Sequence, residues 1–418
     1  MSARTAGIMS AHTEETMADL HPRIRKSAKG LEGEVTRFLA DIVRIRSFST
    51  KEMDVANRIK QEMEQVGFDE VRIDAIGNII GRIGNGPRTI AFDAHIDTVY
   101  PGDPKLWDGD PFSGRIEGGK IWGRGSVDQK SGMASMVYAA KLIKELAINS
   151  DLTLYFTGTV MEEDCEGLCW SHLIENEGIK PELVVITEPT NMNLYRGHRG
   201  RVEIRVHLGG VSCHGSAPER GENAIYKMAR VVPEIESLNE RLEAKPFLGK
   251  GTVTVTEFQS SSPSLCAVPD GASIHLDRRL TTGETGKSAV AEVRDAAKRA
   301  GYPDAGVEIL EYDAVSYTGR RCTTEKYYPT WVLDESSPFL SMASASYESL
   351  FGKQPKVDKW IFSTNAVTIA GRYGIPCLGL GPGDETLAHA PNEACPIDHL
   401  ADAAAFYAAI VARLNGKF

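Results

Sequence analysis

The hydrophobic pattern of this chain changes near residue 195 and changes back near residue 330, and this constrains the fold more than any other feature. Up to residue 195, helical spacing of apolar residues, as in 31–46, 53–66 and 132–146, alternates with short apolar runs. The short runs, which are typical of strands, cover residues 71–73, 78–83, 89–94, 152–158 and 183–187. Strands that alternate with helices predict an α/β domain with a sheet covered by helices on both faces.

Residues 196–315 follow a different order. Strand-like and helical patterns succeed one another at 201–208, 223–242, 251–258, 272–280, 287–300 and 307–312. This β-α-β-β-α-β order predicts a ferredoxin-like α+β domain, with one sheet face open for pairing with a second copy. The α/β pattern then returns and ends in a helix at 398–414. The predicted organisation is a first α/β part at 1–195, an inserted domain at 196–315 and a second α/β part at 316–418.

Length and charge exclude several classes of protein. The 418 residues are too many for one ordinary core. A net charge of −10 disfavours nucleic acid and anionic membrane surfaces as partners, and no apolar run reaches about 18 residues, the length needed to span a bilayer. Residues 1–22 lack the apolar stretch of a secretory signal and are predicted to form a flexible tail. Seven scattered cysteines fit a reducing cytoplasm.

A histidine and an aspartate at the end of the apolar run 89–94 suggest a metal site. His95 and Asp97 are two residues apart, and side chains at such positions of a strand share a face. His95 can then bind a metal while Asp97 accepts a hydrogen bond from its other ring nitrogen. Taken alone, the pair fits a surface histidine beside an acid equally well.

Acidic residues follow other predicted strands and loops. Asp128 lies in a glycine-lined loop before a helix, where its carboxylate can bridge two cations or can cap the helix. Glu162 and Glu163 follow the run 152–158. Adjacent buried acids need positive charge nearby, so one of them is expected to bind metal and the other to take a proton from water. The alternative for this pair is a solvated acidic turn.

Two further residues complete the set. Glu188 ends the run 183–187, and His389 lies in a loop late in the chain. Each is weak evidence alone. Because carboxylates and imidazoles at strand ends can converge on one point, the five segments together predict a metal centre.

Taken in order, these segments resemble the M20 family of metallopeptidases, which includes carboxypeptidases, aminoacylases, acetylornithine deacetylase and succinyl-diaminopimelate desuccinylase. The resemblance extends over residues 31–418. It implies a zinc-peptidase-like catalytic domain and an inserted lid and dimerisation domain. By resemblance, one Zn²⁺ takes His95 and Glu188, a second takes Glu163 and His389, and Asp128 bridges them; Co²⁺ or Mn²⁺ can compete at such sites.

The resemblance also implies catalytic roles. Asp97 supports His95, and Glu162 is the general base in the hydrolysis of an amide. Residues 212–225, with Ser-Cys-His214-Gly-Ser-Ala-Pro and then Gly-Glu-Asn223, resemble the lid signature of the family. There the histidine reaches the active site of the partner subunit and steadies the oxyanion, so a homodimer through the inserted domain is expected.

Further residues of this chain match substrate-binding positions of the family. Arg279 matches the arginine that holds a substrate carboxylate, and Arg199 is a second candidate. Asn223 and Asn365 are expected to contact substrate. The chain departs from the family at Cys266, where relatives often have asparagine three residues before the lid proline. It departs again at Asn365, where many relatives have a Thr/Ser-Asp pair.

The expected activity is cleavage of an N-acyl amino acid or short peptide. A dipeptidase or aminopeptidase, or an N-carbamoyl or ureide amidohydrolase, remains an alternative on the same scaffold. The sequence of residues 362–366 and 387–393 looks closest to a bacterial subgroup of peptidases or selenium-metabolism hydrolases. Two rivals lie further away: a cysteine hydrolase using Cys213 or Cys266, and a catalytically silent binding protein.

Overall fold

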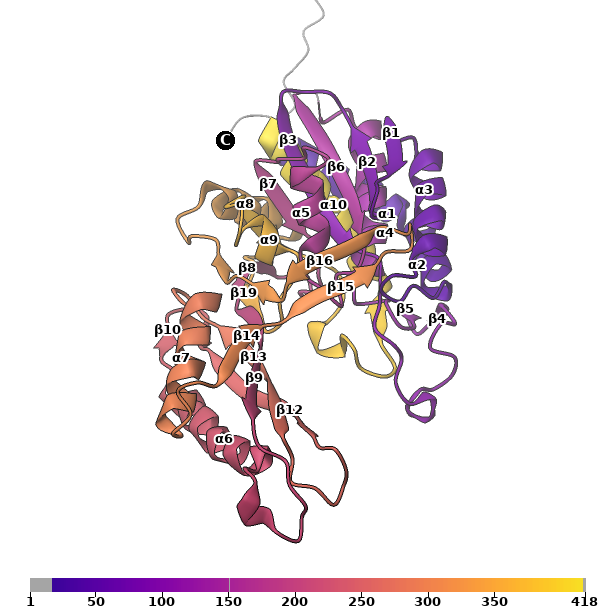
Figure 1. The fold of residues 1–418 in the computed structure, drawn as a ribbon. Helices are drawn as coiled ribbons and strands as arrows, with labels where there is room; N and C mark the ends of the chain where they lie inside the picture. Colours follow the sequence, from indigo (N-terminus) through magenta and orange to yellow (C-terminus); the bar gives the residue numbers. More distant parts are fainter. Residues whose placement is uncertain (1–16, 150, 416–418) are drawn as a thin grey trace, which may run out of the picture.

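The computed structural model describes residues 17–149 and 151–415, and a nine-stranded sheet forms the centre of its larger part (Figure 1). The strand order is β1-β2-β6-β3-β7-β20-β8-β18, with β19 paired to β8. The strands are β1 (Glu70–Ile73), β2 (Ile79–Ile83), β3 (Arg88–His95), β6 (Leu152–Thr159), β7 (Leu183–Ile186), β8 (Leu194–His198), β18 (Trp331–Val332), β19 (Val357–Trp360) and β20 (Cys377–Gly379). The middle strands β6, β3, β7 and β20 are parallel, so their carboxyl ends meet at one edge.

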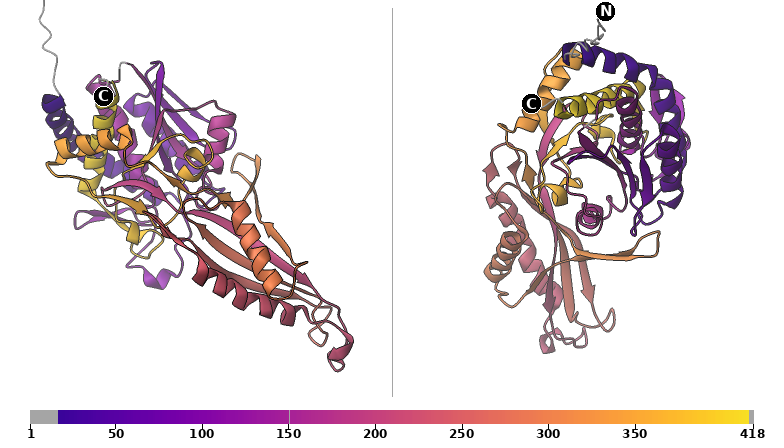
Figure 2. Two further views of the ribbon diagram at one scale, coloured as in Figure 1. Left: turned by 90° about the vertical axis from the view of Figure 1, so that its left-hand side faces the viewer. Right: turned by 90° about the horizontal axis from the view of Figure 1, so that it is seen from above.

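Helices cover both faces of this sheet, as predicted. They are α1 (Met17–Gly30), α2 (Glu32–Arg44), α3 (Met53–Val66), α4 (Lys130–Glu145), α5 (Leu168–Glu175), α8 (Pro338–Phe351), α9 (Ala366–Ile369) and α10 (Ile397–Asn415). Helix α4 packs on α10, and α5 packs on α9. Seen from above, α5 lies inside the curve of the sheet, on the side opposite α1 to α4 (Figure 2). The main core lies between these layers and the sheet.

The prediction of a flexible tail at 1–22 is corrected for its last residues. Helix α1 begins at Met17, and Leu20, Ile24 and Ala28 are buried on the face that it turns to the core. Residues 1–16 lie outside the described part of the chain. No helix within the described ranges is long and apolar enough to cross a bilayer.

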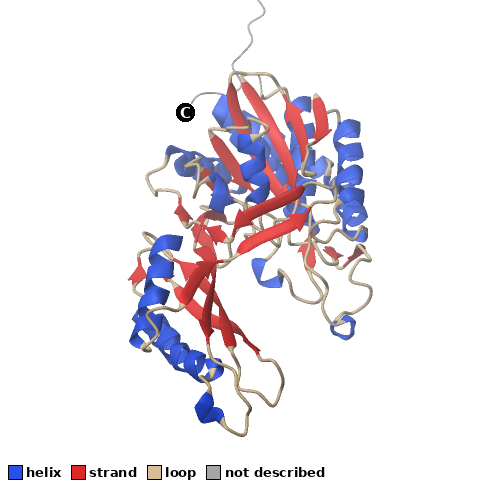
Figure 3. Ribbon diagram, in the orientation of Figure 1, coloured by secondary structure: helices blue, strands red, loops and turns tan. Residues whose placement is uncertain are grey.

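A second, five-stranded sheet forms the smaller part, and its connectivity is β-α-β-β-α-β, as predicted (Figure 3). Its elements are β9 (Gly200–Gly209), α6 (Ala224–Arg241), β12 (Thr252–Ser261), β13 (Gly271–Leu280), α7 (Gly286–Arg299), β14 (Gly306–Ile309) and β17 (Tyr327–Tyr328), with a small ribbon of β10 (Ala244–Lys245) and β11 (Gly249–Lys250). Its strands therefore span residues 200–328, whereas the predicted insert spans 196–315. The difference arises because β8 stays in the large sheet and β17 returns to pair with β9.

Alternation and capping explain this smaller part. Residues of β13 are buried at every second position, which places one face against α6 and α7 in a core of its own. Asn223 caps α6, and Thr285 and Ser288 form a capping box at the start of α7. Strand β12 lies at an edge of the sheet and is largely exposed.

A hairpin of β15 (Glu311–Val315) and β16 (Arg321–Glu325) connects the two parts (Figure 1). At its tip the Tyr317 hydroxyl donates to the Gly77 carbonyl over 2.8 Å, and the Thr318 hydroxyl donates to the Ala75 carbonyl over 2.8 Å. The remaining short elements are β4 (Arg115–Glu117), β5 (Lys120–Trp122) and β21 (Ala394–Pro396), which pair with one another, and three single turns of 3₁₀ helix at Pro104–Leu106, Pro218–Arg220 and Glu385–Leu387.

Candidate metal centre

The predicted metal ligands follow three adjacent parallel strands. His95 is the last residue of β3, Glu162 and Glu163 come just after β6, and Glu188 comes just after β7. The carboxyl ends of these strands therefore bring three distant parts of the sequence to one edge of the sheet. All four side chains lie in the lining of one pocket.

Asp128 holds the middle of this group through its two separate oxygens. Its Oδ1 lies 2.9 Å from Nε2 of His95, and its Oδ2 lies 3.3 Å from Nε2 of His389. Nε2 of His389 is also 2.9 Å from Oε2 of Glu163. A carboxylate whose oxygens face two different histidines has the geometry of a bridging ligand.

The remaining acids stand on the His95 side. Oε1 of Glu188 lies 3.7 Å and Oε2 of Glu162 lies 4.0 Å from Nε2 of His95. Two overlapping groups, one of His95, Asp128 and Glu163 and one of His95, Glu162 and Glu188, have ligand atoms within 4.8 Å of one another. The structure thus brings together all five predicted ligands and the predicted base.

Two acids of this cluster are buried and incompletely hydrogen-bonded. Oε1 of Glu162 and Oε2 of Glu188 are buried and have no hydrogen-bond partner among the described residues. Burial, and then the negative charge of neighbouring carboxylates, raises the pKa of Glu188 well above its usual range. Burial likewise raises the pKa of Glu162 against the opposing attraction of His95. Buried carboxylates with unused oxygens fit a site for divalent cations.

The neighbouring carboxylates also raise the pKa values of the two histidines. Hydrogen bonds to Asp128 and then to Glu163 raise the pKa of His389 to about 10. Burial works against protonation of His95, but hydrogen bonds to Asp128 and Asp97 still hold its pKa well above its usual value. A cation that binds here would compete with protons for both rings.

Asp97 orients His95 and the loop that carries Glu162 and Glu163 through hydrogen bonds. Nδ1 of His95 donates to the carbonyl oxygen of Asp97 over 3.0 Å and lies 3.5 Å from its Oδ1. This contact leaves Nε2 facing the ligands. The carboxylate of Asp97 also accepts the backbone N–H groups of Glu162 and Glu163, at 3.2 and 3.1 Å, and the hydroxyl of Ser49 at 2.6 Å.

Sequence reasoning missed Glu393, which holds the Asp128 loop. Its Oε1 accepts the backbone N–H groups of Val127 and Asp128 at 2.6 and 3.0 Å, and its Oε2 pairs with Arg124 at 2.6 Å. Burial raises the pKa of Glu393 to about 7. Its position four residues after His389, in the same loop, was the available signal.

Glu52 is a second missed residue. Its Oε1 accepts the N–H groups of Thr50 and Met161, while its Oε2 is buried and finds no partner in the described chain. Burial, and then the charge of Asp97, raises its pKa to about 8. Glu52 therefore supports the loop that carries Glu162 but does not line the pocket.

A cavity of about 480 Å³ opens over the metal ligands, which is within the usual size of small-molecule sites. Arg279 of β13 lines it, and its guanidinium donates to both oxygens of Asp277 at 2.8 and 2.9 Å. Arg201 and Glu166 form another part of the wall and are joined by a 2.6 Å hydrogen bond. The smaller part of the molecule thus contributes arginines to the cavity.

Three other predicted substrate residues lie differently. Asn365 is buried, where its amide nitrogen donates to Asp93 and Thr159 and its oxygen accepts the N–H of Gly167. The prediction that it contacts substrate is corrected, because these bonds engage its amide within the core.

Asn223 caps α6, and its oxygen accepts the N–H groups of Ile225 and Tyr226. Its contact with substrate stays a prediction. Arg199 donates to the carbonyl of Lys250 and does not line the cavity. Burial, and then the charge of Arg279, lowers its pKa.

His214 is exposed in the loop that joins β9 to α6. This loop lies at the end of the smaller part, away from β3, β6 and β7 (Figure 1). Its Nδ1 accepts hydrogen bonds from Ser216. The sulfur of Cys213 donates to the Ala217 carbonyl, and the backbone carbonyl of Cys266 accepts the N–H of Gly215. Neither thiol lines the cavity of its own chain, which argues against a cysteine hydrolase.

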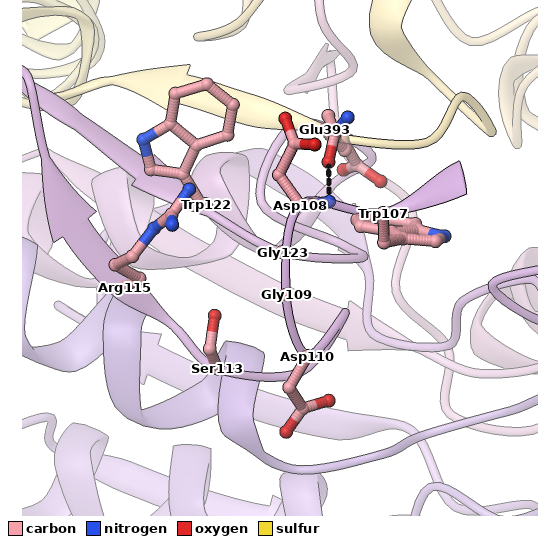
Figure 4. Close-up of a pocket in the computed structure, with 10 residues that line it drawn as sticks. Trp107, Asp108, Gly109, Asp110, Ser113, Arg115, Trp122, Gly123 and Glu393 are labelled. Carbon is pink, nitrogen blue, oxygen red and sulfur yellow. Dashed lines mark hydrogen bonds between the residues drawn. The ribbon is translucent and has the colours of Figure 1, made fainter. Parts of the chain in front are cut away.

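A second hollow of about 100 Å³ lies between Trp107 and Trp122, beside Glu393 (Figure 4). It is too small for an acylated amino acid. The cavity over the metal ligands is the candidate site, because the predicted ligands line it and it is large enough for such a substrate.

Comparisons with known proteins agree with this geometry. The family model for peptidase family M20/M25/M40 matches residues 91–413. The chain is 54% identical over 389 residues to the uncharacterized protein YgeY of Escherichia coli (strain K12), covering 93% of this chain and 96% of the relative. It is 30% identical over 284 residues to the succinyl-diaminopimelate desuccinylase of Cereibacter sphaeroides, covering 65% and 73%.

A solved structure shares the fold at lower sequence identity. YXEP of Bacillus subtilis, described as a dinuclear metal binding peptidase from the M20 family, matches with a TM-score of 0.68 and 16% identity over 93% of this chain and 100% of that one. The predicted resemblance is thus confirmed. The chain belongs to peptidase family M20/M25/M40 and is a metal-dependent amide hydrolase.

Proposed function

We propose that this protein is a two-metal hydrolase that cleaves the amide bond of an N-acyl amino acid or a short peptide, with Glu162 as general base. The observation that carries the proposal is the position of Asp128. Its two oxygens face His95 and His389 in a cluster of buried carboxylates, two of which have an oxygen without a hydrogen-bond partner among the described residues. Bound cations would stabilise such a cluster.

His95 and Glu188 would hold one metal ion, Glu163 and His389 the other, and Asp128 would bridge them. Imidazole and carboxylate ligands suit Zn²⁺, with Co²⁺ and Mn²⁺ as competitors. When bound, the ions supply Lewis acidity that acidifies water and polarises the substrate carbonyl. A dinuclear centre in the structurally similar YXEP supports the count of two.

Glu162 does the proton transfer. Its Oε1 is unpartnered within the described residues, and its backbone N–H is held by Asp97. The side chain would take a proton from the attacking water and deliver it to the leaving amine nitrogen.

The oxyanion donor would come from a second copy. His214 is exposed and does not line the cavity of its own chain, while β12 presents an exposed edge strand. Unpaired strand edges favour association with another chain. We propose a homodimer through the smaller sheet, in which His214 of the partner subunit donates to the developing oxyanion.

The substrate would carry a free carboxylate next to the cleaved amide nitrogen. Arg279 points into the cavity from β13 and is already oriented by Asp277. An arginine held in this way favours a planar carboxylate. The 30% identical desuccinylase relative supports acyl-amino-acid chemistry, and a cytoplasmic location fits the unpaired cysteines. Dipeptidase or carbamoyl hydrolase activity is the alternative function for the same metal centre.

Two measurements test this function together. Protein stripped with a chelator should lose activity on a panel of N-acyl amino acids and dipeptides, and Zn²⁺ or Co²⁺ should restore it; activity that survives stripping would favour a thiol enzyme. With an active substrate in hand, kcat/KM for the acid should exceed that for its C-terminal carboxamide by about tenfold or more. Arg279→Ala should remove most of that preference, and equal rates on acid and amide in the parent would overturn the substrate class.

A further inference from the structure

A second group of metal-type side chains lies where the turn between β1 and β2 meets α5. Asp74 is in that turn, His172 is near the end of α5, and Glu177 follows α5. Nε2 of His172 lies 3.8 Å from Oδ2 of Asp74 and 3.7 Å from Oε1 of Glu177. One ligand atom from each residue lies within 4.8 Å of the other two. None of the three residues lines the cavity over the metal centre.

The imidazole of His172 is buried, and one of its ring nitrogens lacks a hydrogen-bond partner among the described residues. Its side chain is 9% exposed, and over the described ranges of the chain Nε2 has no hydrogen-bond partner. A buried ring nitrogen without a partner is costly, yet two carboxylate oxygens stand just beyond hydrogen-bonding distance. With metal–ligand bonds of about 2.1 Å, tetrahedral ligand atoms lie about 3.4 Å apart, close to the separations observed here.

The two carboxylates are already oriented by other groups. Oδ1 of Asp74 accepts the N–H groups of residues 76–78, and its Oδ2 accepts the side-chain amide of Asn78 at 2.7 Å. Oε2 of Glu177 pairs with Arg72 at 2.5 Å, which turns Oε1 toward His172. Outer hydrogen bonds of this kind hold ligands ready for an ion.

We propose that Asp74, His172 and Glu177 bind a divalent zinc ion at a site separate from the catalytic centre, with water completing the coordination. One imidazole and two carboxylates form a donor set that Zn²⁺ accepts. His172 also lines a hollow of about 350 Å³ that opens to solvent and gives an ion a route in. Arg72, and Arg320 on the rim of that hollow, oppose the approach of a cation, so the affinity should be lower than at the paired centre.

The position of the site indicates a structural role. The turn that holds Asp74 receives the tip of the β15–β16 hairpin, where Tyr317 donates to Gly77. On its other side, Oδ1 of Asn78 accepts the backbone N–H of Val160, two residues before Glu162. An ion that joins this turn to α5 would therefore stabilise the turn between β1 and β2. That turn contacts both the β15–β16 hairpin and the loop that carries Glu162.

The test compares bound zinc in the full-length parent, His172→Gln and Glu177→Gln. His275→Gln is the matched control, because Nε2 of His275 already has a carboxylate partner, Glu203, at 3.1 Å. After equilibrium dialysis at fixed free zinc, elemental analysis should find about one ion fewer per chain in each of the first two variants than in the parent and the control.

Thermal melts give a second readout. Zinc should raise the Tm of the parent by about 2 °C more than that of His172→Gln, as expected for loss of one ligand-linked stabilisation. Because the comparison is a difference, it does not depend on how many ions the catalytic centre holds. Equal zinc content and equal Tm shifts in all four proteins would overturn the proposal and leave His172 as a buried imidazole beside two acids.

Discussion

Oδ1 of Asp97 accepts the backbone N–H of Glu162 over 3.2 Å, so the residue that orients the metal ligand His95 also fixes the loop that carries the base. Its other oxygen accepts the N–H of Glu163 at 3.1 Å. One buried carboxylate thus ties the ligand on β3 to the loop after β6. Changes at this position should therefore affect metal binding and turnover together.

Asp97→Asn should lower metal affinity by about 10–100-fold and reduce turnover, because an amide group cannot accept from all of these donors. Ser49→Ala is the matched control: it removes the hydroxyl bond to Oδ2 and leaves both backbone donors in place. Metal titration and kcat would be measured on both variants. A similar small effect in the two would show that Asp97 is not central to the site.

His389→Ala should reduce bound metal by about one ion per chain relative to the parent, since His389 contacts only the Asp128 and Glu163 side of the cluster. His275→Gln, a substitution in the smaller sheet, should leave the content unchanged. Elemental analysis at the same free metal concentration would measure the ions bound per chain in both variants and the parent. Unchanged content in His389→Ala would remove this residue from the ligand set.

His214→Ala should keep its metal and lose turnover if the residue serves a partner's site. Mixing it with Glu162→Gln should restore activity, because a mixed dimer has one site with an intact Glu162 and a donated His214. Random subunit exchange predicts about a quarter of parental activity. Subunit exchange would be verified by mass spectrometry. If activity then does not recover, His214 does not act in the active site of the partner subunit.

Glu52 should make stability depend on pH. Its folded-state pKa of about 8 lies above the ordinary value of 4.5, so the folded protein binds this proton more tightly than the unfolded chain. The stability it contributes is complete below about pH 4.5 and is lost as pH rises through about 8. Relative to the parent, Glu52→Gln should gain Tm between pH 5 and pH 8 at equal metal loading. Parallel pH curves would contradict the burial of a protonated Glu52.

The positions of His95, Glu163 and Glu188 at one edge of the sheet could be predicted because each comes at or just after a short apolar run. Asp128 and His389 lie in loops, and the resemblance to the family assigned them to the predicted ligand set. Helix α1 left a weaker signal in Leu20, Ile24 and Ala28, four residues apart, which Pro22 obscures. The role of Asn365 could not be predicted. It depends on Asp93, 272 residues away in the sequence, which only the folded sheet brings to hydrogen-bonding distance.

The residues that hold the metal ligands in place could not be predicted either, because their contacts form only in the folded protein. Glu393 reads as one more acid in a polar loop, and only the fold shows its oxygens under the Asp128 backbone. The capping role of Asn223 was also missed, because a helix cap and a substrate ligand use the same residue type. The sequence therefore predicts the chemistry of the centre better than the contacts that hold it in place.

The most direct test of the two-metal mechanism is the turnover and metal content of Glu162→Gln on a substrate that the parent cleaves. Glutamine keeps the size of the side chain and removes its ability to take a proton. We predict unchanged metal content and a fall in kcat of about 10²–10⁴-fold, the usual loss for a general base. A variant that retains its metals and turns over within about tenfold of the parent would contradict the role of Glu162 as the base.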